Sequence, residues 1–349
     1  MAQLVEHDLA KVGVAGSSPV SRSLKELQMQ FLFFIIFYAG DIKLSLADDI
    51  FVANVKDILL NGTSTEGQKV RPHWPDGSKA YTIKKFGLVN RYDLRKEFPA
   101  ITLRRTAIKS CTNEMLWIWQ KKSNNIKDLK SSVWDEWADD SGSIGKAYGY
   151  QMSVKYPFSD VDENGLKRAF GDDYLKHAVF DDEKKIWKMD QVDKVIYDLK
   201  VQPFSRRILT SMYNFGDLSE MHLYPCAYSM TFNVTEENGV RYLNAILNQR
   251  SQDMLTANNW NVAQYSVLLH MLARSCDMEA GELVHVIGDA HIYDRHIPII
   301  NEMIERPRHK APKFYLNPEV KDFYDFTEDD VKLIDYETEP QIKNIPVAI

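Results

Sequence analysis

Cys226 is the residue in this sequence with the clearest capacity for covalent chemistry. It stands in Tyr-Pro-Cys-Ala, at the start of a segment that predicts a β-strand. A lone cysteine is usually a buried structural thiol, and a nearby cation that lowers the pKa of the thiol makes it a nucleophile. Arg250, in the strand-like stretch NQRSQD, offers that cation. From these residues alone, a structural thiol and a nucleophile beside a bound phosphate both stay open.

Two adjacent arginines, Arg206 and Arg207, follow a Pro-x-Ser turn in PFSRRIL. Such pairs are often solvated surface charges, but the guanidinium fork also matches the oxygens of a phosphate. Glu114 lies in the otherwise apolar segment NEMLWIW, where a carboxylate costs free energy unless it is paired or transfers protons. Asn261, before an apolar helical stretch, has the position of a helix N-cap.

Aromatic residues and a histidine offer further binding surfaces. Trp134 and Trp137, in VWDEW, could belong to the core or form a stacking wall for a flat ring. His291 and Tyr293, after Gly288 and Asp289, could bind a ligand or be ordinary strand residues.

The elements that position these residues follow from hydrophobic periodicity. Helical spacing predicts helices over 51–59, ending at Asn61-Gly62, over 192–199 and over 262–272. Strict alternation over 226–234 predicts a strand with one buried face, which Cys226 opens. The polar segment 152–189 predicts an irregular surface excursion. Helices and strands without regular βαβ alternation favour an α+β fold.

Composition excludes several classes of protein. The chain has 349 residues, a net charge of -6, 44% hydrophobic and 26% charged residues, as in a soluble globular protein. The acidic balance argues against nucleic-acid binding as the main role. Three cysteines without metal-ligand spacing predict neither a disulfide framework nor a zinc site, and favour a reducing compartment.

Residues 1–46 differ in character from the rest and contain the apolar run FLFFIIFYAG at 31–40. This run is too short for a transmembrane helix, which needs roughly 20 residues. Three interpretations stay open: the hydrophobic region of a signal peptide, an appended tail without a role in the fold, or a mis-assigned start, because residues 1–23 resemble a translated transfer-RNA gene. We expect residues 47–349 to form one domain, with an insertion at about 152–189.

In combination and order, the motifs resemble the folate-dependent thymidylate synthase family, and its Bacillus- and phage-type branch in particular. The matching stretches are VRPHW, FPAITLRR, NEMLWIW, VWDEWAD, AYGYQ, DQV, PFSRR, YPCA, NQRSQD, NWNVAQY, GDAHIYDRH, NPEVKDFYDF and the terminal PVAI. The resemblance implies a mixed sheet flanked by helices and a homodimer packed sheet to sheet. It also implies a cytoplasmic methyltransferase that uses dUMP and 5,10-methylenetetrahydrofolate, with no metal, nicotinamide, membrane or obligatory nucleic acid.

The resemblance also implies roles for individual residues. Cys226 would add to carbon 6 of the uracil ring, which makes carbon 5 nucleophilic toward the methylene group of the folate. Glu114 and Tyr148 would manage proton transfers, and Asn261 would bond the uracil edge. The other nucleotide contacts would be Arg71, Gln249, Arg250, Ser251, His291 and Tyr293, with Arg206 and Arg207 from the partner subunit.

The folate contacts implied by the resemblance are Asp253 for the pterin, and Trp134, Trp137, Leu223, Ala257, Trp260 and Ala348 along the pocket. The terminal residue, Ile349, would belong to a tail that closes over the folate. Ala257 stands where the family often has glycine, so a position that needs a positive φ would be strained. Ala227 follows the nucleophile where many members carry histidine.

Three alternatives to a thymidylate synthase remain at this point. An unrelated cysteine hydrolase is disfavoured because no motif places a histidine beside Cys226. A deoxyuridylate or deoxycytidylate hydroxymethylase on the same fold would use Cys226 but let water capture the methylene group. Asn261 weighs against the cytosine version, where the family has aspartate. A non-catalytic nucleotide- or RNA-binding relative is disfavoured by the presence of Cys226, Glu114, Asn261 and the arginines.

Overall fold

The computed structural model describes residues 44–349, which form a compact unit. The apolar run at 31–40 and nearly all of the predicted extension lie outside the described residues. The helices are α3 (Leu46–Asn61), α4 (Ile108–Trp119), α5 (Gly149–Ser153), α6 (Glu163–Phe170), α7 (Gln191–Val201), α8 (Asn258–Ser275) and α9 (Ile297–Ile304). Among these residues, no helix is both long and apolar enough to cross a bilayer.

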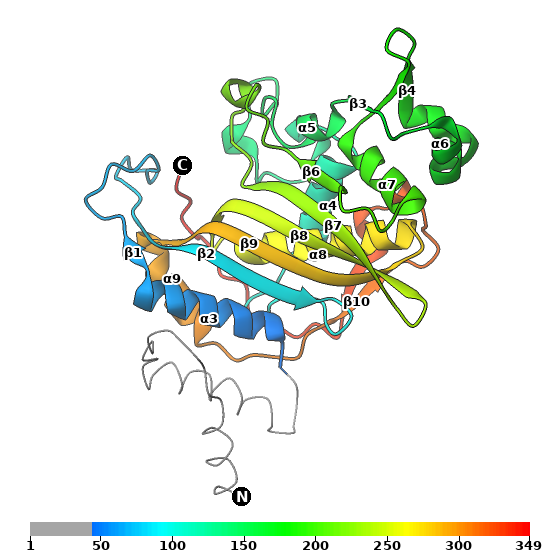
Figure 1. Ribbon diagram of the computed structural model, residues 1–349. Helices are drawn as coiled ribbons and strands as arrows, with labels where there is room; N and C mark the ends of the chain where they lie inside the picture. Colours follow the sequence, from blue (N-terminus) through cyan, green and yellow to red (C-terminus); the bar gives the residue numbers. More distant parts are fainter. Residues whose placement is uncertain (1–43) are drawn as a thin grey trace, which may run out of the picture. The chain divides into compact units, whose positions relative to one another are not determined.

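A six-stranded mixed sheet is the centre of the fold, in the order β1-β2-β9-β8-β7-β6 (Figure 1). Its strands are β1 (Thr63–Ser64), β2 (Thr82–Asp93), β6 (Leu209–Ser211), β7 (Ala227–Glu237), β8 (Val240–Asp253) and β9 (Glu279–Tyr293). Neighbouring strands are antiparallel except β8 and β9, which are parallel. A parallel pair needs a long crossover, and α8 supplies it.

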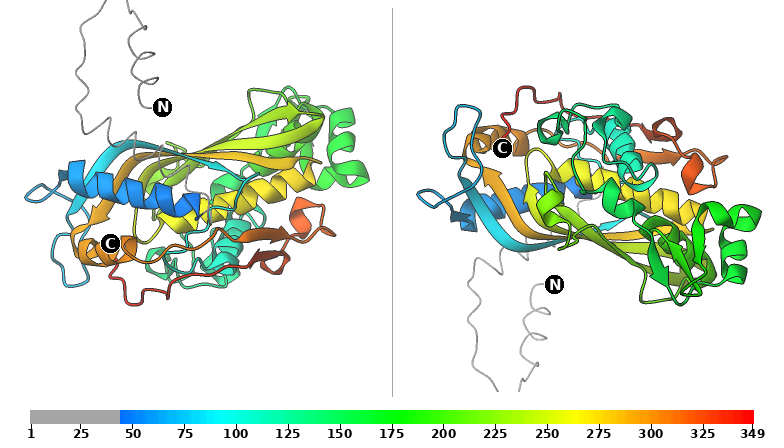
Figure 2. Two further views of the ribbon diagram at one scale, coloured as in Figure 1. Left: turned by 90° about the horizontal axis from the view of Figure 1, so that it is seen from below. Right: turned by 90° about the horizontal axis from the view of Figure 1, so that it is seen from above.

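Helices cover one face of this sheet. Helix α8 lies behind β8 and β9 in Figure 1 and packs in turn against α4, and Figure 2 shows both helices on the same side of the sheet. The helices predicted over 51–59, 192–199 and 262–272 are confirmed as α3, α7 and α8, and α3 ends at Asn61 as expected. The mixed sheet flanked by helices, and with it the α+β class, is confirmed.

The opposite face of the sheet carries apolar side chains that the described chain leaves exposed. Val89 of β2 is 58% exposed, Ile246 of β8 is 39% exposed, and Leu209 of β6 is 55% exposed. Strand register puts Ile246 beside Val284 of β9 in the same sheet face. Monomeric proteins rarely leave the middle of a sheet face apolar and uncovered, so this face has the character of an interface.

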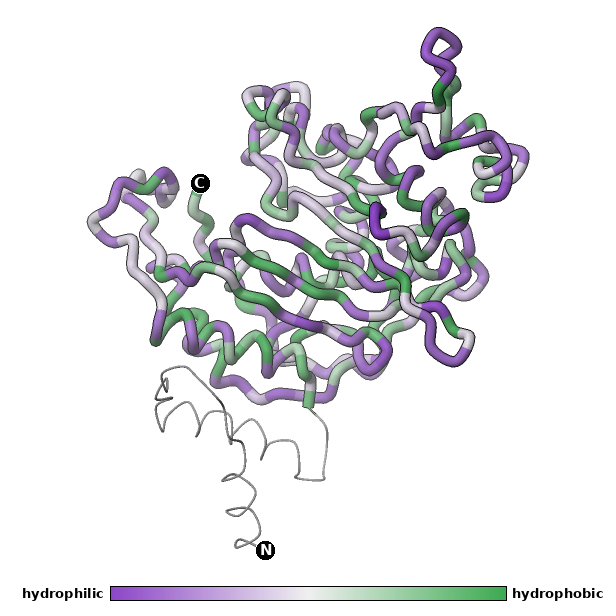
Figure 3. Tube along the Cα trace, viewed as in Figure 1, coloured by the Kyte–Doolittle hydropathy of each residue, from purple (hydrophilic) through white to green (hydrophobic). Residues whose placement is uncertain are grey.

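The segment 152–189 is more ordered than its polar sequence predicts. It contains α6 and the three-stranded sheet β3-β5-β4, made by β3 (Tyr156–Phe158), β4 (Ala178–Asp181) and β5 (Ile186–Met189). Leu166 and Met189 form a second small core with Tyr197 of α7. A few buried side chains suffice to order this segment, and its assignment as a surface insertion stays a prediction. The turn between β4 and β5 is hydrophilic (Figure 3).

A last two-stranded sheet pairs β10 (Lys313–Leu316) with β11 (Val331–Ile334). The chain then runs to its C-terminus, where Ile349 exchanges two backbone hydrogen bonds with His73 (N to O 2.8 and 2.9 Å). Because His73 lies two residues from Arg71, the tail and the Arg71 loop are held together.

Candidate active site

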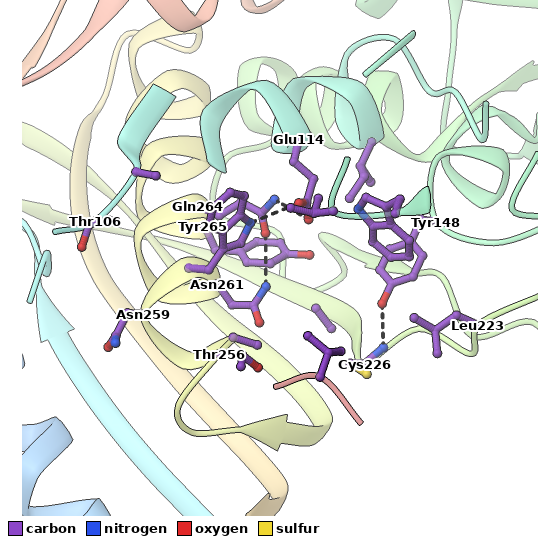
Figure 4. Close-up of a pocket in the computed structure, with 18 of the residues that line it drawn as sticks. Thr106, Glu114, Tyr148, Leu223, Cys226, Thr256, Asn259, Asn261, Gln264 and Tyr265 are labelled. Atoms are coloured by element: carbon purple, nitrogen blue, oxygen red, sulfur yellow. Dashed lines mark hydrogen bonds between the residues drawn. The ribbon is translucent and has the colours of Figure 1, made fainter. Parts of the chain in front are cut away.

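A cavity of about 540 Å³ opens between α4, the start of α8 and the first residues of β7 (Figure 4). More than half of the residues singled out from the sequence line it. These are Glu114, Trp134, Trp137, Tyr148, Leu223, Cys226, Gln249, Ala257, Trp260 and Asn261. Segments far apart in the sequence thus meet around one space, as expected of a binding site.

Cys226 sits at the entrance of β7, and its orientation depends on a bulge. The pairing of β7 with β8 shifts register between Ala227 and Ser229. Ala227 is buried and Cys226 is half-buried, and both line the cavity, so the simple alternation expected from the sequence does not hold at the strand start. Bulges commonly re-aim side chains next to active sites in this way.

The thiol of Cys226 has a cation and a phenol beside it. Nη2 of Arg250 lies 3.7 Å from Sγ, while the same guanidinium donates to the carbonyl oxygens of Tyr224 and Pro225. Burial raises the pKa of the thiol, and Arg250, Tyr148 and Arg71 act against that rise. Burial is the larger influence, and the Arg250 guanidinium lies where a cation favours the thiolate.

Tyr148 is held beside Cys226 by a hydrogen bond from the backbone of that residue. Its hydroxyl accepts a hydrogen bond from the backbone N–H of Cys226 at 3.0 Å, drawn in Figure 4. The residue has φ of 46°, a conformation that non-glycine residues rarely adopt. The ring also meets Trp134 edge-on at 4.9 Å between centroids. Backbone strain of this kind concentrates at functional sites, where surrounding structure imposes it.

Glu114 projects from α4 into the cavity and is 7% exposed. Its two carboxylate oxygens accept from different partners: Oε1 from Nε2 of Gln264 at 3.2 Å, and Oε2 from Nε1 of Trp260 at 3.1 Å. Burial raises the pKa of Glu114 to about 7, and these hydrogen bonds oppose the rise. A carboxyl group that gains and loses its proton near neutral pH suits general acid–base chemistry.

Asn261 is part of α8 rather than its N-cap, which is Ala257. The N-cap interpretation is therefore wrong by one turn of helix. Asn261 bonds Gln264 on its own helix and Gln249 on β8, at 3.3 and 3.2 Å. Residues three apart on a helix share a face, so α8 aims Asn261 and Gln264 at the same side of the cavity.

His291 and Tyr293 lie at the end of β9 and outside the cavity lining, with their rings edge-on at 5.1 Å. Asp289 accepts from Nδ1 of His291 at 3.0 Å and from Nζ of Lys84 at 2.9 Å. In the strand register, Ser251 of β8 stands opposite Asp289. The structure thus groups His291, Tyr293 and Ser251 near the carboxyl ends of the central strands β8 and β9, in the same region as Arg250.

The predicted phosphate arginines do not all meet within this chain. Arg71 lies close enough to lower the pKa of both Cys226 and Tyr293 electrostatically. Arg206 and Arg207 instead occupy the turn between α7 and β6 and do not line the cavity. Arg207 is exposed. Arg71 and Arg250 also lie outside the cavity lining, but both act on the Cys226 thiol, whereas Arg206 and Arg207 are not among the groups that do so.

Asp253 does not line the cavity, although its partner Thr256 does. Its carboxylate accepts from Thr256 Oγ1 at 2.6 Å, from the backbone N–H groups of Leu255 and Thr256, and lies 3.6 Å from Nδ1 of His296. Ala257 has φ of -112°, so the alanine is not strained there. At the tail, Val347 lines the cavity, whereas Ala348 does not.

Several lining residues were not singled out from the sequence. They include Arg104 and Arg105, at the end of FPAITLRR, and Gln264 and Tyr265 of α8. Both arginines belong to a stretch quoted for the resemblance, so a count of cations in matched motifs would have found them. Gln264 carries no sequence signal, because its role depends on helix packing. Within residues 44–349 no cluster of histidine, cysteine and carboxylate side chains could hold a metal ion.

Fold and cavity together define an α+β enzyme with a cysteine poised beside an arginine. The thymidylate synthase family model matches residues 49–349, and the chain belongs to this family of methyltransferases. The chain is 39% identical over 286 residues to thymidylate synthase of Bacillus subtilis subsp. natto, covering 81% of this chain and 92% of the relative. Thymidylate synthase of Bacillus phage phi3T is 38% identical over the same length, with the same coverage. The Bacillus-type branch is thereby confirmed.

A solved structure supports the same family. Thermostable thymidylate synthase A from Bacillus subtilis superposes with a TM-score of 0.73 and 37% sequence identity, covering 86% of this chain and 99% of that chain.

Proposed function

We propose that this chain converts dUMP to dTMP and methylenetetrahydrofolate to dihydrofolate. The observation that carries the proposal is the cavity in which Cys226, flanked by Arg250 and Tyr148, faces the hydrogen-bonded side chains of Glu114 and Asn261. A nucleophile on one side of the cavity and hydrogen-bonding side chains on the other suit a pyrimidine ring. Family membership supports the same substrates.

The proposed role of Cys226 is covalent. Its thiolate adds to carbon 6 of the uracil ring, and the electron pair of the 5,6 double bond moves toward O4. Carbon 5 then attacks the methylene carbon. Once carbon 5 has lost its proton, the bond between the methylene carbon and the folate nitrogen breaks and leaves an exocyclic methylene group on the ring. Tetrahydrofolate then gives a hydride to that methylene group as the thiolate leaves carbon 6, which yields dTMP and dihydrofolate. Arg250 stabilises the attacking thiolate and, with Arg71, binds the phosphate, which holds the ring against the sulfur.

Glu114 and Tyr148 have complementary proposed roles. Glu114, with a pKa of about 7, can deliver and recover a proton near O4 as negative charge develops there. The Tyr148 hydroxyl lies on the sulfur side and is placed to help remove the proton from carbon 5. Asn261 donates to O4 and accepts from N3–H of uracil. His291 and Tyr293 hold the sugar hydroxyl, with Ser251 and Gln249 completing the nucleotide site.

The cavity also fits a folate co-substrate, which supplies the methylene group and the hydride. Trp134, Trp137 and Trp260 offer flat apolar walls for a pterin, and Leu223 and Ala257 complete them. Arg104 and Arg105 at the same cavity suit the carboxylates of a glutamate tail. These walls exclude water, which would otherwise compete with hydride for the methylene group. Asp253 would have to leave its bonds to Thr256 to reach a pterin directly.

The experiment that tests the proposal is product analysis. Purified protein is incubated with dUMP and methylenetetrahydrofolate, and nucleotide and folate products are separated by chromatography. We expect dTMP and dihydrofolate in equal amounts. Hydroxymethyl-dUMP with tetrahydrofolate would instead identify the hydroxymethylase, and absence of any product would contradict both.

We also propose a homodimer packed through the uncovered sheet face. The exposed side chains Val89, Leu209 and Ile246 supply the apolar surface such an interface needs. Arg206 and Arg207 lie outside their own cavity and would complete the phosphate site of the partner subunit. An isologous interface brings each such turn to the other subunit's site in the same way. Cytoplasmic localisation and independence from nucleic acid remain predictions.

A further inference from the structure

Four buried side chains and the half-buried Asn261 form a continuous series of hydrogen bonds along one wall of the cavity. His285 of β9 bonds Oε1 of Gln249, and Nε2 of Gln249 donates to Oδ1 of Asn261 at 3.2 Å. Nδ2 of Asn261 donates to Oε1 of Gln264 at 3.3 Å, and Nε2 of Gln264 donates to Oε1 of Glu114 at 3.2 Å. Figure 4 shows the part of this series that runs from Asn261 through Gln264 to Glu114.

Which atoms donate and which accept along this series of hydrogen bonds is determined at Glu114, where the series ends. Nε2 of Gln264 also lies 3.4 Å from the backbone carbonyl oxygen of Cys111, which can only accept. Oε2 of Glu114 faces the indole N–H of Trp260, which can only donate. The amide nitrogen of Gln264 must therefore point toward Glu114 and Cys111, and its oxygen toward Asn261.

Each later link follows from the one before it. Because Oε1 of Gln264 can only accept, Asn261 must offer its nitrogen there and its oxygen to Gln249. Gln249 must then offer its nitrogen to Asn261 and its oxygen to His285. This arrangement requires a proton on Nε2 of His285.

His285 is suited to that role. It is fully buried, and burial lowers its pKa to about 3, so the ring is neutral with one proton. Nδ1 has no hydrogen-bond partner among the described residues. A proton on Nδ1 would be a buried donor without an acceptor, which costs about 1–3 kcal/mol, so the proton belongs on Nε2. His285 and Glu114, at the two ends of the series, therefore require the same order of donors and acceptors.

We propose that His285 and Gln264 are positioning residues that lock the side-chain amide of Asn261 in one orientation and thereby select uracil over cytosine nucleotides. Neither needs to touch the base. This proposal rests on the proposed function, in which Asn261 bonds the edge of the ring. A free asparagine could rotate its amide by 180° and serve cytosine, whose exocyclic amine donates and whose N3 accepts.

Rotation of the Asn261 amide is prevented by its two partners. It would bring the oxygen of Asn261 against the oxygen of Gln264, and the nitrogen of Asn261 against the nitrogen of Gln249. Two buried hydrogen bonds would be lost at once, each leaving unsatisfied groups. A site with fixed hydrogen-bond polarity can reject the wrong partner by several orders of magnitude.

The test compares the dissociation constants of dUMP and dCMP, measured by titration calorimetry, together with kcat and KM for dUMP. We expect wild-type protein to favour dUMP at least 100-fold. Gln264→Leu removes two links, so we expect the dUMP/dCMP preference to fall at least tenfold. His285→Gln replaces a ring of fixed polarity by an amide that can rotate, so the preference should fall while the melting temperature changes little.

The matched control is Gln252→Leu, which alters another buried glutamine of β8 whose side-chain amide has no hydrogen-bond partner among the described residues. This variant should keep the full preference for dUMP. An unchanged preference in folded Gln264→Leu and His285→Gln proteins would overturn the proposal, and so would equal weakening of both nucleotides. A wild-type protein that neither binds dUMP nor forms dTMP would instead contradict the proposed function itself.

Discussion

At the scale of single residues, Cys226 is the group on which the proposed chemistry depends. Replacing it by serine removes the thiolate but little volume. We expect Cys226→Ser to reduce kcat by at least about 10³-fold while leaving the melting temperature unchanged, because an alcohol at neutral pH is a far weaker nucleophile. Initial-rate assays of dTMP formation measure the loss.

The matched control is Cys276→Ser. Cys276 is a buried cysteine at the C-cap of α8, and it does not line the cavity. This variant should retain nearly full activity, and comparable losses in both variants would contradict the nucleophile assignment.

Glu114 makes folding stability depend on pH. Its folded-state pKa of about 7 lies above its usual value of 4.5, so the native state retains a proton that the unfolded state releases. The free energy of unfolding should therefore fall between pH 4.5 and 7, by roughly 3 kcal/mol from this group. Glu114→Gln should flatten this fall and strongly reduce kcat. Urea denaturation at pH 5 and pH 8 measures the difference, and parallel losses in wild type and variant would refute it.

Among the elements, the C-terminal tail is held at its last residue. Ile349 bonds the backbone of His73, the carbonyl oxygen of Pro346 accepts from His296, and Val347 lines the cavity. Deleting residues 347–349 opens the folate side and also removes the two bonds that hold the Arg71 loop. We expect kcat to fall at least tenfold, with a smaller loss of dUMP binding because Arg250 still binds the phosphate. Lys343→Ala serves as a control with an intact tail, and full kcat in the truncated protein would contradict this role of the tail.

Helix α3 sets the point at which the folded domain begins. The boundary expected at residue 47 cuts into this helix, whose first residues contact the core. The Asp48 carboxylate accepts from Thr102 N at 2.8 Å and from its hydroxyl, and Ala47 is buried. Deleting residues 1–43 should therefore preserve activity and stability. Deleting 1–48 should lower the free energy of unfolding by about 2–4 kcal/mol, because it leaves buried Thr102 groups without a partner. Equal stability of the two truncations would contradict this role of Asp48.

At the scale of the whole molecule, shared active sites can be tested by mixing inactive subunits. Cys226→Ser and the double variant Arg206→Ala/Arg207→Ala should each be poorly active. Unfolding and refolding them together should restore up to about one quarter of wild-type activity, because each heterodimer then contains one intact site.

The control for this experiment mixes Cys226→Ser with Arg250→Ala. Arg250 lies 3.7 Å from the sulfur of Cys226 within one subunit, so both residues belong to the same proposed site. One site of this heterodimer lacks the thiol and the other lacks the arginine, so activity should not recover. Failure of the first mixture to recover would argue against arginines that cross the interface.

The sequence by itself determined the family, the main helices and the principal groups in the cavity. Helix periodicity repeats every turn, so α3, α7 and α8 were predictable from local pattern. Cys226, Glu114, Tyr148 and Asn261 were predictable because they stand in motifs whose order resembles a known family.

Tertiary structure alone decided how these groups act together. A bulge after Cys226 determines which way the thiol faces, and it depends on the pairing of two strands. The links from His285 through Gln264 to Glu114 join β9, α8 and α4, which no local pattern relates. The small core in 152–189 arises because Leu166 and Met189 meet Tyr197 in space. Packing brings such groups together across long sequence separations, and only the folded chain reveals the polarity of the resulting hydrogen bonds.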